Sequence, residues 1–214
     1  MRKLLPLLSV LFLIYWGCED KEEPPTEVTL WGEIYSVEDT ERLDFHRNEL
    51  TGPIPSEIWN LTNLTYLDLS ENQFTGSIPS KIGNLTNLTV LDLSQNQLTG
   101  SIPSKIGNLT NLTYLSLSEN LLTGEIPSEI WNLTNLIELN LYNNDLTGSI
   151  SPEIGNLTNL TYLYLSYNQL SGIIPDEICN QGDSSPDLSY NQLCPPYPSC
   201  IEDYVGYQDT SNCD

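Results

Sequence analysis

Pairs of leucines separated by a single residue recur along most of the chain at intervals of 24 residues. Such alternation predicts a short strand whose two leucines point to the same side. Parallel stacking of successive strands, about 4.8 Å apart, would join these leucines into one core that no single unit could bury alone. The pairs, the first of which contains a phenylalanine, are Leu43/Phe45, Leu67/Leu69, Leu91/Leu93, Leu115/Leu117, Leu139/Leu141 and Leu163/Leu165.

An asparagine follows each predicted strand, at the point where the chain leaves it. A buried amide must have all its hydrogen bonds satisfied. We therefore expect these side chains to bond to backbone groups of their own and the neighbouring coil, as a ladder along the array. The members of this asparagine ladder are Asn48, Asn72, Asn96, Asn120, Asn144, Asn168 and Asn191.

Each unit continues with a glycine and an Ile-Pro pair, as in Gly100 and Ile102-Pro103. The glycine permits a positive φ in the turn, and the proline is expected to keep the far side of the coil extended instead of helical. Two positions depart from this pattern. Pro152 arrives one residue late, which predicts a break in the far strand, and Gln181 replaces an expected leucine, which marks the end of the array.

The complete motif, Leu-Thr-Gly-x-Ile-Pro-x-x-Ile-Gly-Asn-Leu-Thr-Asn-Leu, closely resembles the plant-type leucine-rich-repeat family over residues 40–193. That family includes plant receptor ectodomains, and similar arrays occur in bacterial surface lipoproteins. The resemblance implies an α/β-class leucine-rich-repeat solenoid. It is expected to be mostly β, with a parallel concave sheet of about seven coils and short 3-10 or irregular convex segments.

The N-terminal segment has the features of an export signal followed by a lipid anchor. Two basic residues precede an apolar stretch, residues 4–16, that is shorter than a bilayer span of about 20 residues. The pair Gly17-Cys18 resembles the cleavage site of bacterial lipoproteins, at which Cys18 would be acylated. An ordinary secreted protein with a spare cysteine is the alternative. Residues 19–29 are acidic and contain two prolines, so they read as a tether.

The end coils of a solenoid need caps that cover the exposed core. At the N-terminus the lid is expected to consist of Trp31, Ile34, Tyr35 and Val37. The chain is therefore predicted to divide into a signal peptide (1–17), an acidic tether (18–30), an N-terminal cap (31–42), a repeat array (43–193) and a cysteine-containing C-terminal cap (194–214).

Four of the five cysteines, Cys179, Cys194, Cys200 and Cys213, cluster at the C-terminus. An even cluster in an exported chain predicts disulfides, although four cysteines allow three pairings. Asn-x-Leu-Cys…Cys resembles the cap of plant-type arrays, and this resemblance implies a Cys194–Cys200 bond that leaves Cys179 to pair with Cys213. Zinc is the weaker alternative because the spacings contain no C-x₂-C pair.

The charge balance narrows the choice of partners. The chain has 7 Lys+Arg against 29 Asp+Glu, for a formal net charge of −22. Binding to phosphates or to an anionic lipid surface needs clustered basic residues, so nucleic acid and direct membrane docking are not expected. Neutral, basic or cation-bridged partners are favoured.

The residues that flank each leucine pair form four columns expected to face solvent on the concave sheet. The C-terminal coils concentrate tyrosines in these columns, beside acidic and amide side chains. Tyrosine supplies a large rigid contact area with a polar tip, so we predict a ligand-binding patch; tolerated β-forming residues on an exposed strand are the alternative. The patch comprises Tyr114, Glu138, Asn140, Tyr142, Asn143, Tyr162, Tyr164 and Tyr167.

Asp44, Asp68 and Asp92 share one of these columns in the N-terminal coils. A weak Ca²⁺ site bridging the carboxylates is conceivable, but a solvated acidic strip is the plainer interpretation, and no other metal site or cofactor is expected. His46 is the only histidine, and no nucleophilic, phosphate-binding or metalloprotease motif is present. The sequence therefore predicts a protein that is not an enzyme.

Three functions remain. The leading one is a cell-surface recognition module, at the cell envelope and lipid-anchored to an outer membrane or else secreted, that binds a protein, peptide or glycan on its concave sheet. The second is a structural spacer or adhesin. The third is ice binding, for which regular threonine rows are available: Thr62, Thr86, Thr110, Thr134 and Thr158, with Thr65, Thr89 and Thr113 beside them.

Overall fold

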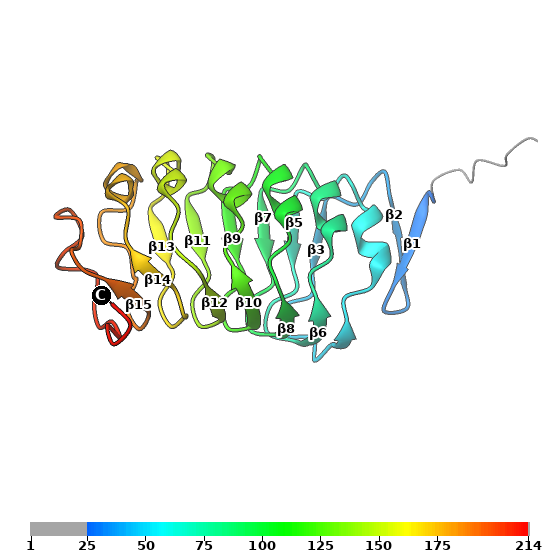
Figure 1. Ribbon diagram of the computed structural model, residues 1–214. Helices are drawn as coiled ribbons and strands as arrows, with labels where there is room; N and C mark the ends of the chain where they lie inside the picture. Colours follow the sequence, from blue (N-terminus) through cyan, green and yellow to red (C-terminus); the bar gives the residue numbers. More distant parts are fainter. Residues whose placement is uncertain (1–24, 214) are drawn as a thin grey trace, which may run out of the picture.

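The computed structural model describes residues 25–213. The predicted signal peptide, the acylation of Cys18 and the first part of the tether lie outside these residues. The described chain winds into a solenoid of stacked coils, with the N-terminal hairpin at one end and the cysteine-containing segment at the other (Figure 1). This confirms the predicted leucine-rich-repeat solenoid. No helix within residues 25–213 is long and apolar enough to cross a membrane.

One parallel sheet, here called the six-stranded sheet, contains the leucine pairs. Its order is β13-β11-β9-β7-β5-β3, so each coil adds one strand next to the last. Equivalent residues pair across the sheet, as in Arg42↔Tyr66 and Tyr66↔Val90. An isolated parallel bridge between Tyr164 and Asp187 extends the pairing to a further coil. The strands are β3 Arg42–Asp44, β5 Tyr66–Asp68, β7 Val90–Asp92, β9 Tyr114–Ser116, β11 Glu138–Asn140 and β13 Tyr162–Tyr164.

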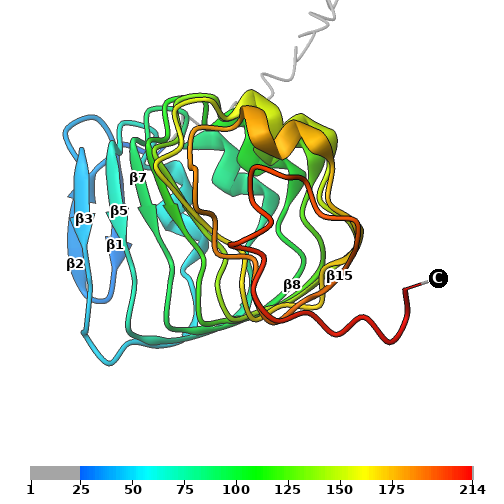
Figure 2. The same cartoon turned by 90° about the vertical axis from the view of Figure 1, so that its left-hand side faces the viewer.

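A second parallel sheet, here called the five-stranded sheet, has the order β12-β10-β8-β6-β4. It was not expected from the sequence as a separate sheet. In the view down the solenoid, β3, β5 and β7 lie on one side of the core and β8 lies on another (Figure 2). The strands are β4 Thr51–Pro53, β6 Gln73–Ser77, β8 Gln97–Gly100, β10 Leu121–Glu125 and β12 Asp145–Thr147.

Short 3-10 helices lie on the convex side of the coils, as the family resemblance implied, whereas the expectation that proline keeps this whole side extended is wrong. The proline itself is extended, with φ −71° and ψ 137° at Pro103, but it is the N-cap of the helix that follows. Because a proline before the first helical residue removes no helical hydrogen bond, the helix can begin directly after it. The helices are η1 Ser56–Asn60, η2 Ser80–Asn84, η3 Ser104–Asn108, η4 Ser128–Asn132, η5 Pro152–Asn156 and η6 Asp176–Asn180.

The two departures from the repeat have structural consequences. Where Pro152 arrives late, Ser151 becomes the N-cap of η5, and β12 in this coil is the last strand of the five-stranded sheet. Some pairing continues, since Ser171 N donates to Gly148 O at 2.8 Å. Gln181 is buried in place of a leucine, and its Oε1 accepts a hydrogen bond from Asp183 N at 2.6 Å.

The leucine columns fill the core, and asparagine side chains hold the turns beside them. Asn120 is representative: its Nδ2 donates to the carbonyls of Leu93, Leu117 and Ser118 at 3.0–3.1 Å, and its Oδ1 accepts from Leu98 N at 3.0 Å. These bonds link each coil to the preceding one. The first member differs, because Asn48 is exposed and its side chain makes a single hydrogen bond, to His46 O, within the described residues.

The N-terminal cap begins earlier than predicted, and of the four predicted lid residues Ile34 is not part of it. The hairpin of β1 Glu27–Leu30 and β2 Glu33–Ser36 occupies the last part of the predicted 18–30 tether. Val28 and Leu30 are buried, whereas Ile34, predicted to belong to the lid, is 67% exposed. The period of two in a strand explains the error, because Ile34 pairs with exposed Thr29 on the outer face.

Aromatic packing completes this cap. The ring of Trp31 lies 4.5 Å from that of Phe45 and 5.7 Å from that of Phe74, and Tyr35 lies 6.2 Å from Phe45. Val37 is partly buried against the same core. The N-terminal end is therefore closed by apolar packing and by hydrogen bonds such as that of Asn63 Nδ2 to Glu38 O at 2.7 Å.

The C-terminal cap is closed by disulfides, but the predicted pairing is wrong. The bonds are Cys179–Cys200 and Cys194–Cys213, with Cα–Cα distances of 5.8 and 5.6 Å. Strand β15 Gln192–Cys194 pairs with β14 Ser171–Ile173. After β15 the chain runs to Cys200, which is bonded to Cys179 of η6, and then returns to Cys213, which is bonded to Cys194 of β15. Cys213 accordingly lies next to Cys194 of β15.

Candidate functional site

The solvent side of the six-stranded sheet carries the predicted columns, but only some of them are open. The column of serines after the strands is buried, with Ser70, Ser94, Ser118 and Ser166 each 0–9% exposed. This corrects the expectation that all four columns face solvent. The serine hydroxyls bond to neighbouring side chains of the sheet instead of facing solvent; for example, Ser94 Oγ donates to Asp92 Oδ1 at 2.6 Å.

In the N-terminal coils the charged side chains bind one another. The guanidinium carbon of Arg42 lies 3.4 Å from the centroid of the Tyr66 ring, and its Nη2 donates to Asp44 Oδ2 at 2.8 Å. The hydrogen bond to Asp44 raises the pKa of Arg42. Arg47 forms an ion pair with Glu71, and this bond lowers the pKa of the Glu71 carboxyl.

The column of Asp44, Asp68 and Asp92 is in register across β3, β5 and β7. Each carboxylate accepts hydrogen bonds from neighbouring protein groups. Asp68 is an example: its Oδ1 accepts from Ser70 N and Oγ at 3.0 and 2.6 Å, and its Oδ2 accepts from the Tyr66 hydroxyl at 3.1 Å. Within residues 25–213 no three His, Cys, Asp or Glu side chains are grouped to hold a metal ion. The geometry does not favour the Ca²⁺ hypothesis.

The middle of the sheet contains Tyr114 between two carboxyl groups. Its hydroxyl donates to Asp92 Oδ2 at 3.2 Å, and Glu138 is its register neighbour on β11. Burial is the main cause that raises the pKa of Tyr114, of Asp92 and of Glu138, and the negative charge of Asp92 adds to it at Glu138. Within the described residues, neither Asp92 nor Glu138 forms an ion pair with a basic side chain.

The C-terminal strands present two parallel tyrosine rings. Tyr162 and Tyr164 project from the same face of β13, with centroids 6.2 Å apart and an interplanar angle of 7°. Tyr162 is 48% exposed. Tyr162 pairs with Glu138 and Tyr164 with Asn140, whose Oδ1 accepts from Tyr142 N at 3.1 Å. Burial and then the charge of Glu138 raise the pKa of Tyr164.

A second group of tyrosines, here called the tyrosine strip, follows the strands. Tyr142 packs edge-on against Tyr167 at 5.4 Å, Tyr167 stacks on Tyr190 at 4.2 Å, and Tyr190 lies 5.6 Å from Tyr207. Tyr167 and Tyr190 share a left-handed backbone conformation with φ 54°, as does Asn143 with φ 53°. This conformation recurs in every coil and directs the side chain outward. The predicted patch is thus two adjacent groups and not one.

Sequence reasoning missed Tyr190 and Tyr207. Tyr190 could have been found, because Asp187-Leu188-Ser189-Tyr190-Asn191 continues the repeat grammar and puts Tyr190 in the column of Tyr167. Tyr207 lies outside the repeat. It comes beside Tyr190 because the cap folds back, with Tyr190 N donating to Tyr207 O and Asn191 bridging to Gln208.

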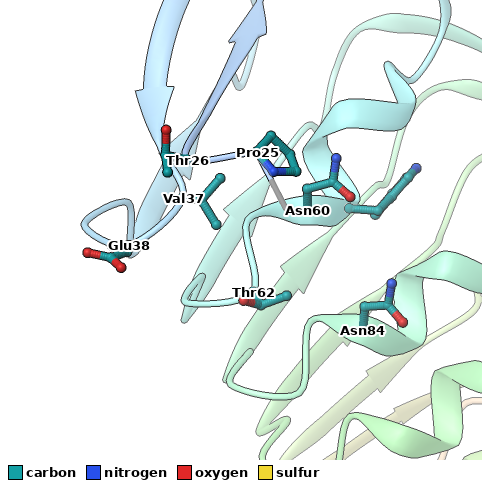
Figure 3. A pocket seen from close by; sticks show the side chains of 8 residues that line it. Pro25, Thr26, Val37, Glu38, Asn60, Thr62 and Asn84 are labelled. Carbon is teal, nitrogen blue, oxygen red and sulfur yellow. The ribbon is translucent and has the colours of Figure 1, made fainter. Parts of the chain in front are cut away.

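A cavity of about 360 Å³ lies at the opposite end of the solenoid, between the N-terminal cap and the first two 3-10 helices (Figure 3). Trp59 lines it but keeps its Nε1 buried, without a hydrogen-bond partner in residues 25–213. The same is true of Trp131, three repeats further on, so this feature belongs to the repeat packing and does not indicate a ligand. The lining residues are Pro25, Thr26, Val37, Glu38, Trp59, Asn60, Thr62 and Asn84.

Stacked coils, one leucine spine and an asparagine ladder define a solenoid whose function resides on exposed surfaces. The sequence model described as "Leucine-rich repeat region" matches residues 42–180. The chain belongs to the leucine-rich-repeat family, in its plant-type form. A search of curated proteins finds no match to the sequence.

Several solved structures are similar to this chain. The plant peptide hormone receptor RGFR1 in complex with RGF2 is 46% identical, with a TM-score of 0.66, over 68% of this chain and 23% of the receptor chain. The Arabidopsis receptor kinase HAESA, in complex with the peptide hormone IDA and the co-receptor SERK1, is 44% identical, with a TM-score of 0.70, over 72% and 26%. A plant ice-binding protein is 37% identical, with a TM-score of 0.64, over 71% and 48%.

Proposed function

We propose that the chain is an exported recognition module that binds a protein or peptide through the C-terminal half of its six-stranded sheet. One observation carries the proposal: the tyrosines of β13 and of the tyrosine strip gather there, half-exposed, on a rigid sheet. Aromatic side chains of this kind dominate binding energy at protein interfaces because they bury large areas at low entropic cost.

The likeness to peptide-bound receptor ectodomains supports this proposal. The chain covers less than a third of each of those receptor chains, so their partners are not transferred to it. What the likeness supports is the class of ligand, a peptide or protein. A glycan ligand remains an outcome for the test to reveal, since sugar rings also stack on tyrosine.

Two disulfides and the receptor ectodomain relatives support a location outside the cytoplasm, where such bonds persist. We extend the proposal to an anchor at Cys18, which would hold the solenoid at a cell surface through the acidic tether. Mass spectrometry of the exported protein would detect the acyl chains on Cys18, and a Cys18→Ser variant released into the medium would support the anchor.

The proposed surface is tested by replacing Tyr142, Tyr162 and Tyr164 with alanine together. The purified protein and this triple variant would be probed on peptide and glycan arrays, with circular dichroism to show that both are folded. Loss of the ligands in the variant supports the proposal. A matched control is Thr51→Ala, Thr75→Ala and Thr99→Ala on the five-stranded sheet, which should bind as the parent does. Unchanged binding by the tyrosine variant would remove the surface.

Ice binding is the second candidate, because a plant ice-binding protein is among the similar structures and one threonine row is exposed on consecutive coils. The row beside it is less available, since Thr65, Thr89 and Thr113 donate their hydroxyls to carbonyls of the preceding coil. Inhibition of ice recrystallisation would be measured for the parent and for Thr86→Lys, Thr110→Lys and Thr134→Lys combined. Activity that survives this change, or is absent from the parent, eliminates the candidate.

A further inference from the structure

We infer that the C-terminal end of the six-stranded sheet recognises guanidinium groups, so that the ligand is an extended basic peptide segment bearing arginine. This inference rests on the proposed function and specifies the chemistry of the ligand for the same surface. It is carried by a comparison within the molecule, because the same sheet already binds one guanidinium group of its own.

The internal example is Arg42 in the N-terminal coils. Its guanidinium carbon lies over the ring of Tyr66, 3.4 Å from the centroid, and its Nη2 donates to Asp44 Oδ2 at 2.8 Å. Tyr66 occupies the first open column of the sheet and Asp44 the second. A tyrosine face together with a carboxylate is the combination that attracts a guanidinium, through cation–π attraction and a charge-assisted hydrogen bond. The geometry of this sheet therefore suits that group.

The same columns at the C-terminal end carry the same chemistry without a cation. Tyr162 stands in the column of Tyr66, with Glu138 beside it on the neighbouring strand. Tyr164 stands in the column of Asp44, and its bridge partner is Asp187. Burial, and after it the charges of Glu138 and other neighbours, raise the pKa of Tyr164. The two parallel rings therefore have a carboxylate on each neighbouring coil, Glu138 on one side and Asp187 on the other.

The coils that follow Lys105 in the described part of the chain contain no basic residue that could supply the missing cation. Lys105 is the last basic residue in the sequence, so every coil after it, and the whole C-terminal cap, contains acidic residues but no lysine, arginine or histidine. Each of those coils adds to a negative field over the C-terminal surface. Such a field attracts a basic ligand and speeds its association, most strongly at low ionic strength.

The tyrosine strip extends this surface and favours an elongated ligand. Its rings are spaced 4.2–5.6 Å apart from Tyr142 to Tyr207, and they run on from the strands into the cap. Asp187, the bridge partner of Tyr164, accepts hydrogen bonds from the hydroxyls of Ser166 and Ser189 at 2.6 and 2.8 Å. A peptide that crosses from β13 to the strip would meet aromatic faces throughout, with carboxylates at its side.

The test uses two fluorescein-labelled nonapeptides of identical length. One has three arginines alternating with glycines, and the other has citrulline in place of each arginine, which preserves the shape and removes the charge. Fluorescence anisotropy with the purified chain would measure both affinities. We expect the citrulline peptide to bind at least about tenfold more weakly, the range of a few cation–π contacts, and the arginine peptide to weaken as salt is raised.

Variants locate the site. Tyr162→Leu and Tyr164→Leu are expected to lose affinity for the arginine peptide, whereas Tyr162→Phe and Tyr164→Phe keep it, because phenylalanine retains the aromatic face. Glu138→Gln should reduce it. Tyr66→Leu is the matched control, since that ring is already covered by Arg42, and it should leave the affinity unchanged. Circular dichroism would show that each variant is folded.

The outcomes separate this inference from the proposed function. Equal affinity for the two peptides, or a Phe variant that binds as poorly as the Leu variant, overturns guanidinium recognition. If neither peptide binds, the inference is also overturned. The proposed function is judged independently by the array, where a neutral or acidic ligand that is lost in the triple tyrosine variant would leave the binding surface in place with a different chemistry.

Discussion

The two halves of the six-stranded sheet are built from one repeat, but the side chains on their open surfaces make different contacts. In the N-terminal half, Arg42 and Arg47 neutralise the nearby carboxylates and cover Tyr66. In the C-terminal half, Tyr162 and Tyr164 stand among carboxylates with no basic side chain in their own coils. Because the repeat framework is the same in both halves, the few residues in the open columns determine the difference. In one half the carboxylates and the tyrosine are already bound by arginine side chains, and in the other half they are available to a partner.

The two ends of the solenoid differ in the same way, since one is closed by packing and the other by covalent bonds. Removing the Cys179–Cys200 bond by Cys→Ser at both positions should lower the free energy of unfolding by about 3 kcal/mol, because the bond closes a loop of 21 residues. Urea denaturation would measure this. A loss near zero would show that packing of Ile201 and Val205, together with the remaining Cys194–Cys213 bond, holds the cap.

The asparagine ladder should show a gradient from its open end to its middle. Asn120→Ala leaves several buried backbone groups without partners and should cost about 2 kcal/mol. Asn48→Ala removes one exposed hydrogen bond and should cost under about 0.5 kcal/mol. Thermal or urea unfolding of the matched pair would measure the difference. Equal losses would mean that burial of the amide does not determine its contribution.

Removing Arg42 should give the N-terminal half of the sheet the binding property proposed for the C-terminal half. Arg42→Ala uncovers Tyr66 and frees Asp44, at a stability cost below about 1 kcal/mol, because the pair is solvent-exposed. The variant should then bind a second arginine peptide, which isothermal titration calorimetry would report as a stoichiometry of two. A stoichiometry that stays at one would show that the N-terminal half lacks some other part of the site.

A smaller effect is expected from one glutamate in each half, because ionisation of Glu71 stabilises the fold whereas ionisation of Glu138 destabilises it. The pKa of Glu71 is lowered by its bond to Arg47, so its ionised form stabilises the fold above the ordinary pKa, and Glu71→Gln should reduce stability at pH 7. The pKa of Glu138 is raised by burial, so its ionised form opposes folding, and Glu138→Gln should increase stability at pH 7.

As the pH falls, the effect of Glu138→Gln should disappear first, because Glu138 becomes protonated in the folded state above its ordinary pKa. The effect of Glu71→Gln should persist until the pH falls below that ordinary value and then be lost. Urea midpoints between pH 7 and pH 3 would follow both. The same sign for the two variants at pH 7 would contradict this account of their surroundings.

The array itself was predictable because its pattern is local and repeated. The leucine pairs predicted the strands of the six-stranded sheet, and the late Pro152 indicated the coil in which the five-stranded sheet ends. The buried serine column was not predicted, since its hydroxyls bond to neighbouring side chains: Ser70 and Ser94 to the aspartate two residues earlier, Ser118 to Ser116 and Ser166 to Asp187. Ile34 was misplaced because a single hairpin at the cap has no neighbouring repeat to fix its register.

Among the candidate site residues, the sequence singled out Tyr162, Tyr164 and Tyr167 by their columns, and the structure shows which of them meet. It could not indicate that Arg42 covers Tyr66, because this contact depends on the rotamer of one long side chain. Nor could it bring Tyr207 to Tyr190, since that contact depends on how the cap folds back.

The sequence by itself determined the solenoid, its leucine spine, its asparagine turns and the absence of basic residues beyond Lys105, because each follows from residue types repeated at a fixed period. Only the tertiary structure decided the disulfide partners, the outward face of Ile34 and the contact of Tyr207 with Tyr190 at the C-terminal end. These features depend on non-repeating segments, whose contacts arise from the path of the chain in space and not from any period along it.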